Sequence, residues 1–224
     1  MTTDSGLTTR ERVSSDVQSE AALPHGRFYA FEGIDGAGKS TVANRAFEVL
    51  TVGTDREVVL TSEPTDSWLG DCVRHSHDEG VGPISEALLF VADRASHTER
   101  IRKWLEEGTI VLSDRYYAST LAYQGAALKP LLGDKALEWL KSINEPAIIR
   151  PDLTFLLVIP PAMGMKRLSG RNERTKFEKL DFLREVDKIY RSLAEGDETF
   201  VVIDASRPIE EVTGTIVEAL KSNL

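Results

Sequence analysis

The sequence predicts an α/β fold, in which helices cover both faces of a doubly wound, parallel, five-stranded sheet. Three observations lead to this prediction. Short apolar runs of strand type occur five times along the chain. Segments with apolar residues at helical spacing lie between these runs, as the crossovers of a parallel sheet require. A glycine-rich loop joins the first run to the first helical segment, and the carboxyl ends of such strands are where ligands bind.

The individual elements follow from the spacing of apolar residues. Strands are expected at 28–31, 57–61, 109–113, 153–159 and 199–204. Three of the later four are continuous and rich in β-branched residues, which is typical of strands buried on both faces. Helices are expected at 40–50, 83–107, 134–143, 180–193 and 210–220.

Size and composition indicate one domain at residues 27–224, preceded by a disordered tail at 1–26. The tail is polar and has no aromatic residue, and a partner-binding arm is the alternative. A net charge of -9 argues against a dedicated nucleic-acid-binding protein, which normally has a basic face. The single cysteine, Cys72, excludes an internal disulfide. With no apolar run of membrane-spanning length, we expect a cytoplasmic protein that has no membrane partner.

A phosphate-binding loop is predicted where the first strand ends. Residues 33–40 match the pattern G-x-x-x-x-G-K-[ST]. Backbone N–H groups and the dipole of the next helix form an anion site, in which Lys39 reaches the β- and γ-phosphates and Ser40 binds Mg²⁺. An ordinary strand-to-helix turn is the alternative. The residues expected at the ATP phosphates are Gly33, Ile34, Asp35, Gly36, Ala37, Gly38, Lys39, Ser40 and Thr41.

The third strand ends in an acidic and a basic residue. Asp114 is placed to hold Mg²⁺ directly or through water, as Walker-B acids do. Arg115 could bind phosphate oxygens with two parallel hydrogen bonds. A structural ion pair is an equally good explanation of this pair alone, and the phosphate loop favours the nucleotide site.

Four motifs together resemble the thymidylate kinase family. They are the loop at 32–41, T-x-E-P at 61–64, L-F-x-A-D-R-A at 89–95 and D-R-Y-x-x-S-x-x-A-Y-Q at 114–124. They occur in the family's order and spacing over about residues 28–220. The resemblance implies a P-loop kinase fold with a small helical lid. It also implies transfer of the γ-phosphoryl group of ATP to dTMP, with Mg²⁺ as cofactor, and a homodimer.

The resemblance also assigns the base and the sugar of dTMP. It implies that Phe90 stacks on thymine and that Arg94 donates to its O4 atom, where cytosine would present an amino group. Thr120 would bind N3 of the base, and Tyr123 would pack where a 2′-OH would point. Core packing is the alternative for both aromatic residues, and pairing with helix neighbours of Asp93 at the surface is the alternative for Arg94. The full implied set is Asp35, Glu63, Pro64, Arg74, Phe90, Arg94, Arg115, Ser119, Thr120 and Tyr123.

The second strand ends at a motif that departs from the family's pattern. Glu63 and Pro64 border the base pocket in the family, whose proline is often cis, and the sequence does not decide the isomer. Ser62 stands where many relatives have arginine. Arg74 is the candidate to supply the missing charge.

Phosphoryl transfer needs cations near the transferred group. The resemblance assigns Asp35 to the 3′-OH and the metal region, and Arg115 to the acceptor phosphate. The basic stretch at 166–178 resembles the lid, and because Gly36 stands where some relatives carry arginine, the lid should supply a cation. A solvated basic surface is the alternative. The implied catalytic set is Lys39, Asp35, Arg115, Arg171, Arg174 and Lys176.

Other interpretations involve different residues or different protein classes. Cys72, His75, His77 and Asp78 are expected in a surface loop, because no second cluster completes a metal site. His97 is expected on a helix surface. Another nucleoside or nucleoside-monophosphate kinase is the nearest alternative function. A nucleotide-dependent switch is the third, and the [NT]-K-x-D motif of GTPases is absent.

Overall fold

A computed structural model describes residues 26–168 and 173–224. The expected tail therefore lies outside the described residues, apart from Gly26. The strands are β1 (Arg27–Glu32), β2 (Val58–Ser62), β3 (Ile110–Asp114), β4 (Leu153–Val158) and β5 (Phe200–Asp204). The helices are α1 (Lys39–Gly53), α2 (Trp68–Asp78), α3 (Pro83–Glu106), α4 (Tyr117–Leu132), α5 (Lys135–Asn144), α6 (Pro161–Leu168), α7 (Glu173–Glu195) and α8 (Ile209–Lys221), with a short 3-10 helix η1 (Glu145–Ala147).

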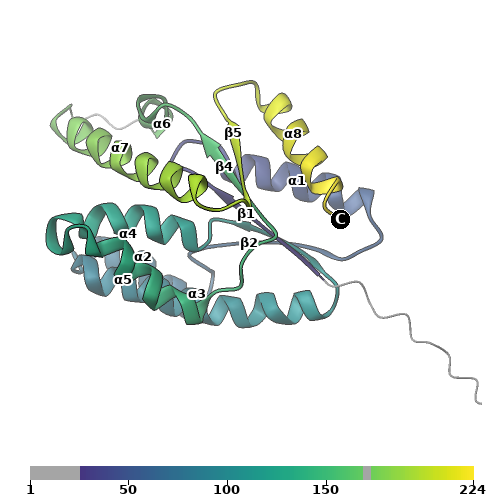
Figure 1. The fold of residues 1–224 in the computed structure, drawn as a ribbon, viewed down its shortest axis with the longest axis horizontal. Coiled ribbons are helices and arrows are strands. Elements are labelled where there is room, and N and C mark those ends of the chain that lie inside the picture. The colour runs from purple at the N-terminus through teal and green to yellow at the C-terminus, as the bar shows by residue number, and fades with distance from the viewer. Residues whose placement is uncertain (1–25, 169–172) are drawn as a thin grey trace, which may run out of the picture.

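The described strands form one parallel sheet in the order β2-β3-β1-β4-β5. This confirms the predicted fold class, and each predicted strand agrees with the structure to within one residue at either end. Helices α1 and α8 lie together on one side of the sheet, whereas α3, α4 and α5 lie on the other (Figure 1). The chain leaves β1 and β3 toward opposite faces, so the crevice between their carboxyl ends is the natural ligand site.

The core explains why β1 is continuously apolar from Phe28 to Phe31. Phe28 and Ala30 pack in the cluster that includes side chains of α3, α4 and α5. Tyr29 and Phe31 pack in a larger cluster that includes side chains of α1 and α8. Because successive side chains of a strand point to opposite faces, a strand covered on both faces must be continuously apolar. The central strand is thereby held rigidly beneath the loop that follows it.

Helices α2, α4 and α6 were not among the predicted helices. The segment with Cys72, His75 and His77 forms helix α2, so the predicted surface loop is wrong. Ser67 caps this helix by accepting a hydrogen bond from the N–H of Gly70 at 3.3 Å, a local signal of a helix start. Helix α4 begins directly after the Asp-Arg motif, which was interpreted only as a ligand-binding strand end. Among the described residues, no group of three or more His, Cys, Asp or Glu could hold a metal.

None of the described helices is both long enough and apolar enough to cross a membrane.

Candidate active site

The loop between β1 and α1 has the geometry of an anion site. Gly33, Gly36 and Gly38 all have positive φ angles, of 139°, 80° and 95°. A Cβ atom at Gly33 would lie 2.4 Å from the carbonyl oxygen of Leu157, and one at Gly36 would lie 2.7 Å from that of Gly164. Glycine is therefore required both by the backbone angles and by the close approach of neighbouring chain segments. The N–H groups at the start of α1 have no side-chain cap.

Lys39 and Ser40 open helix α1 below this loop. Lys39 is buried, and its Nζ atom donates to the carbonyl oxygen of Ile34 at 3.0 Å. Burial lowers the pKa of Lys39 to about 8, and nearby Arg115 adds to this effect. An anionic ligand at the loop would favour the charged form.

Ser40 and Asp114 bring two oxygen ligands together. The Ser40 hydroxyl donates a short hydrogen bond to Oδ2 of Asp114, at the end of β3. The other carboxylate oxygen, Oδ1, is buried and has no hydrogen-bond partner among the described residues. A buried, unpartnered oxygen is costly unless something binds it. Since Mg²⁺ takes oxygen ligands and keeps waters and phosphates in its other positions, this donor set fits Mg²⁺.

Arg115 links the loop to helix α4. Its guanidinium forms an ion pair with Asp35 of the loop and donates to the Ser119 hydroxyl at 3.2 Å. It also lies 5.3 Å from the ring centroid of Tyr123, a cation–π contact. The Tyr123 hydroxyl accepts a hydrogen bond from the Asp35 N–H at 2.8 Å. The two sequence motifs at 32–41 and 114–124 therefore form one cluster.

We use the name loop cluster for Asp35, Lys39, Ser40, Asp114 and Arg115. All were predicted site residues, and the structure brings them together. Thr41, the last residue of the predicted loop set, lies exposed on the first turn of α1.

Glu32 supports this cluster and was missed as a functional residue. One oxygen accepts from the N–H groups of Tyr116 and Ser119, at 2.9 and 3.1 Å. The other accepts from the hydroxyls of Ser119 and Tyr190, at 2.6 and 2.9 Å. Burial raises the pKa of Glu32 despite these hydrogen bonds. Its carboxylate caps the start of α4. The sequence signal that could have indicated this role is an acidic residue at the end of a buried apolar strand.

The second part of the site is a buried network around Arg94. Its guanidinium donates to Oε2 of Glu63 at 2.6 Å, to Oδ1 of Asn144 at 2.7 Å and to the hydroxyl of Thr120 at 2.9 Å. Arg94 is 1% exposed and Glu63 is 5% exposed. The peptide bond between Glu63 and Pro64 is cis. The predicted surface pairing alternative for Arg94 is therefore wrong.

His97 belongs to this network, and the prediction that it lies on a helix surface is wrong. It is 1% exposed. Its Nδ1 atom lies 3.0 Å from Oε1 of Glu63, and Nε2 lies 2.8 Å from the Thr61 hydroxyl. His97 follows Arg94 by three positions in α3, which places both on one face of that helix. That spacing could have indicated its place, whereas nothing local pointed to Asn144.

We use the name buried network for Glu63, Arg94, His97, Thr120 and Asn144. It touches the loop cluster through α4, since Ser119 contacts Arg115 and the adjacent Thr120 contacts Arg94.

Known proteins resemble this chain along most of its length. The family model described as thymidylate kinase matches residues 31–216. The chain belongs to the thymidylate kinase family. It is 41% identical to a probable thymidylate kinase of Methanococcoides burtonii, over 88% of this chain and 97% of that protein. It is 44% identical to one of Methanosarcina barkeri, over 88% of this chain and 99% of that protein. A third, from Methanoculleus marisnigri, is 44% identical over 85% of this chain and 92% of that protein.

Phe90 and Arg74, two residues predicted to bind dTMP, lie at the edge of the buried network. Phe90 is half-buried on α3, one turn before Arg94, with its ring centroid 6.3 Å from that of His77. Arg74 is exposed on α2, where it pairs with Asp71 at 2.7 Å and contacts the carbonyl oxygen of Pro64 at 3.5 Å. Arg74 thus lies beside the cis peptide bond.

The predicted lid is only partly described. Arg171 lies outside the described residues, and the side chains of Arg174 and Lys176, at the start of α7, are not among those described. Arg167 of α6 donates to the carbonyl oxygen of Gly36 at 2.8 Å. A basic residue of the 166–178 stretch, other than those predicted, thus contacts the phosphate loop.

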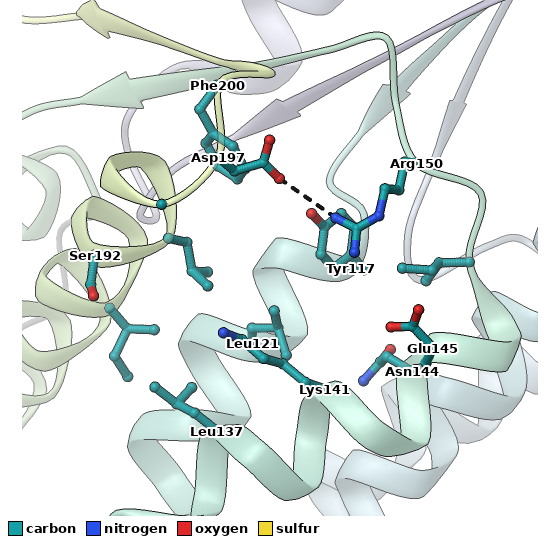
Figure 2. A pocket seen from close by; sticks show the side chains of 14 residues that line it. Tyr117, Leu121, Leu137, Lys141, Asn144, Glu145, Arg150, Ser192, Asp197 and Phe200 are labelled. Atoms are coloured by element: carbon teal, nitrogen blue, oxygen red, sulfur yellow. Dashed lines mark ion pairs between the residues drawn. The ribbon is translucent and has the colours of Figure 1, made fainter.

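A pocket of about 320 Å³ lies away from the loop cluster, among α4, α5 and α7. Figure 2 shows the ion pair between Arg150 and Asp197 on one side of it, at 3.7 Å, and the leucine side chains of Leu121 and Leu137. None of the predicted site residues lines this pocket. It shares only Asn144 with the buried network.

Proposed function

We propose that the chain transfers the γ-phosphoryl group of ATP to the 5′-phosphate of dTMP, yielding ADP and dTDP for dTTP synthesis. The observation that carries this proposal is the joining of two sites by helix α4. Ser119 contacts Arg115 beside the phosphate loop, and Thr120 contacts Arg94 of the buried network. Two nucleotides bound end to end would then meet at Arg115. The names of the relatives support the same reaction.

ATP would bind with its phosphates on the loop backbone and on Lys39. Ser40 and Asp114 would hold Mg²⁺, in keeping with the unpartnered Oδ1 atom of Asp114. When bound, Mg²⁺ supplies charge neutralisation at the phosphoryl oxygens. The loop N–H groups and the Lys39 ammonium are fixed before the substrate arrives, so they stabilise developing charge without rearrangement.

Arg115 would hold the acceptor phosphate of dTMP. Its guanidinium forms an ion pair with Asp35, and a phosphate would compete for the same guanidinium. The acceptor phosphate is already ionised, so no strong general base is needed. Catalysis would come from the alignment of the two phosphates and from the cations between them.

The base of dTMP would lie against the buried network. Phe90 would stack on the ring, and Arg94 would donate to O4, which distinguishes thymine from cytosine. Thr120 would meet N3, and Tyr123 would pack against the sugar. Glu63, Pro64, Arg74 and Ser119 would complete the wall of the dTMP site.

The lid would close over the transferred group with Arg171, Arg174 or Lys176. The contact of Arg167 with Gly36 supports the approach of this region to the phosphate loop. Closure would exclude water from the γ-phosphate while the substrates are held.

We further propose a cytoplasmic homodimer. Apolar side chains of α2 and α3 are exposed, with Trp68 at 72%, Leu88 at 48% and Ile84 at 39%. Exposed apolar groups on neighbouring helices are typical of an association surface. Light scattering of the wild type and of Trp68→Glu would test this, with a monomeric wild type contradicting it.

A coupled assay for ADP release tests the proposed reaction. The wild type is compared on dTMP, dUMP, TMP, dCMP and AMP, with Lys39→Ala as the inactive control. Preference for dTMP supports the proposal, and preference for AMP or dCMP rejects it. If no monophosphate is turned over while ATP still binds, the chain is a nucleotide-dependent switch.

A further inference from the structure

The buried network extends one step beyond the arginine that is proposed to meet the base. The carboxylate of Glu63 has two partners on opposite sides, Arg94 at Oε2 and His97 at Oε1. The second ring nitrogen of His97 contacts the hydroxyl of Thr61. Thr61 is the next-to-last residue of strand β2 and precedes the cis peptide bond. His97 therefore ties the carboxylate to the sheet.

The partners of the His97 ring decide which nitrogen donates. Nδ1 lies 3.0 Å from Oε1 of Glu63, and an ionised carboxylate can only accept, so Nδ1–H donates to Glu63. Nε2 lies 2.8 Å from the hydroxyl of Thr61, which can donate to it.

This arrangement fixes the plane of the Glu63 carboxylate. A carboxylate held at one oxygen can rotate, whereas one held at both cannot without losing a hydrogen bond. The orientation of the Arg94 guanidinium depends on that plane, because Glu63 accepts a hydrogen bond from one of its nitrogens. The Nε edge of the guanidinium is buried and has no hydrogen-bond partner among the described residues. The other anchors of Arg94 are Asn144, Thr120 and the carbonyl oxygen of Tyr116, the last at 3.4 Å, and its guanidinium lies 5.7 Å from the ring centroid of Tyr116.

We propose that His97 is a positioning residue: through Glu63 it holds the guanidinium of Arg94 in the orientation that distinguishes thymine from cytosine. The inference rests on the proposed function of the site. His97 does not contact the reacting phosphates in this role. Its loss should therefore weaken base recognition and leave the chemical step nearly unchanged.

Two substitutions separate the contacts of the ring. Asparagine places its amide nitrogen near the position of Nδ1 and keeps the donor to Glu63. Glutamine places its amide near Nε2, so His97→Gln keeps the contact with Thr61 and loses the donor to Glu63. The pair is matched in polarity and removes the imidazole in both cases.

Steady-state kinetics with dTMP, dUMP and dCMP then tests the role. His97→Gln should raise KM for dTMP about tenfold, the effect of one lost hydrogen bond to a charged group, with kcat within about twofold. Selectivity for dTMP over dCMP should fall about tenfold as well. The dTMP to dUMP ratio is the internal control, since both bases carry O4 and the ratio should not change. His97→Asn should stay within about threefold of the wild type in KM.

Several outcomes would overturn the inference. Equal losses in both variants would show that the donor to Glu63 is not what matters. A lower melting temperature with unchanged KM and selectivity would make His97 merely structural. If the wild type is active on dTMP and His97→Gln matches it, the inference alone fails. If the wild type does not use dTMP, the proposed function fails and takes this inference with it.

A spectroscopic measurement checks the geometry without any turnover. In long-range ¹H–¹⁵N spectra of the full chain, which has four histidines, the resonances absent from His97→Gln identify His97. A proton on Nδ1 and a bare Nε2 support the inference. A proton on Nε2 alone would contradict it.

Discussion

The loop cluster and the buried network both pair acidic with basic side chains, but they hold their charges in different ways. In the loop cluster, Arg115 and Asp35 remain 23% and 40% exposed. In the buried network, the side chains of Arg94 and Glu63 are 1% and 3% exposed. The partners in the loop cluster are ones that a bound phosphate or metal could replace. The partners in the buried network are internal to the protein.

The difference has a physical reason. A phosphoryl group moves during the proposed reaction, so the cations around it must exchange partners. The base takes no part in the reaction, so the side chain that recognises it is best held rigid before binding. The cost of this rigidity is a buried ion pair, which destabilises the fold strongly if one member is removed. Four predictions test this contrast.

The largest effect is expected in the loop cluster, on rate. Lys39→Met should lower kcat by about 10³-fold, because a fixed cation at the transferred group is lost. Its melting temperature should not fall, since burial lowers the pKa of Lys39 and the ammonium is held at a cost in the ligand-free protein. Single-turnover kinetics and thermal unfolding measure the two quantities. A kcat within tenfold of the wild type would contradict the assignment.

The next effect is expected in the buried network, on stability. Glu63→Ala should reduce the free energy of unfolding by about 3–5 kcal/mol, because the charge of Arg94 is left buried without its partner. Arg115→Ala, in the partly exposed pair, should cost about 1 kcal/mol or less. Urea unfolding of both variants provides the comparison. Equal losses would remove the distinction between the two regions.

A smaller effect concerns the metal. Asp114→Asn should raise the Mg²⁺ concentration needed for half-maximal rate by about tenfold or more, since one charged oxygen ligand is lost. Titration of the rate with Mg²⁺ measures this. Asp204→Asn, at the end of the edge strand β5, serves as the control and should leave the titration unchanged. An unaltered Mg²⁺ requirement in Asp114→Asn would place the metal elsewhere.

The smallest effect, on KM, is expected at the contact between the motifs at 32–41 and 114–124. Tyr123→Phe removes the acceptor of the Asp35 N–H and should raise KM for dTMP by about three- to tenfold, the value of one hydrogen bond. Tyr117→Phe is the matched control, because Tyr117 lines the separate pocket in Figure 2. If the two variants behave alike, the contact between Tyr123 and the loop has no role in binding.

Local patterns in the sequence determined the α/β class, the position of each strand and the phosphate loop. Buried strands must be apolar along their length, and the loop needs glycine at fixed positions. Both requirements are visible within about ten neighbouring residues. The family resemblance, confirmed by the comparison, extended the prediction to Arg94 and to its partners Glu63 and Thr120. It did not reach Glu32, His97 or Asn144.

Those supporting groups were decided only by the tertiary structure. Arg94 meets Asn144 across 50 positions of the chain, and Glu32 meets Tyr190 across 158. A buried polar group must find a partner, but which one it finds depends on how helices pack, and no local pattern encodes that. For the same reason His97, on a helix that is exposed along much of its length, could be placed in the interior only once α3 was seen against β2.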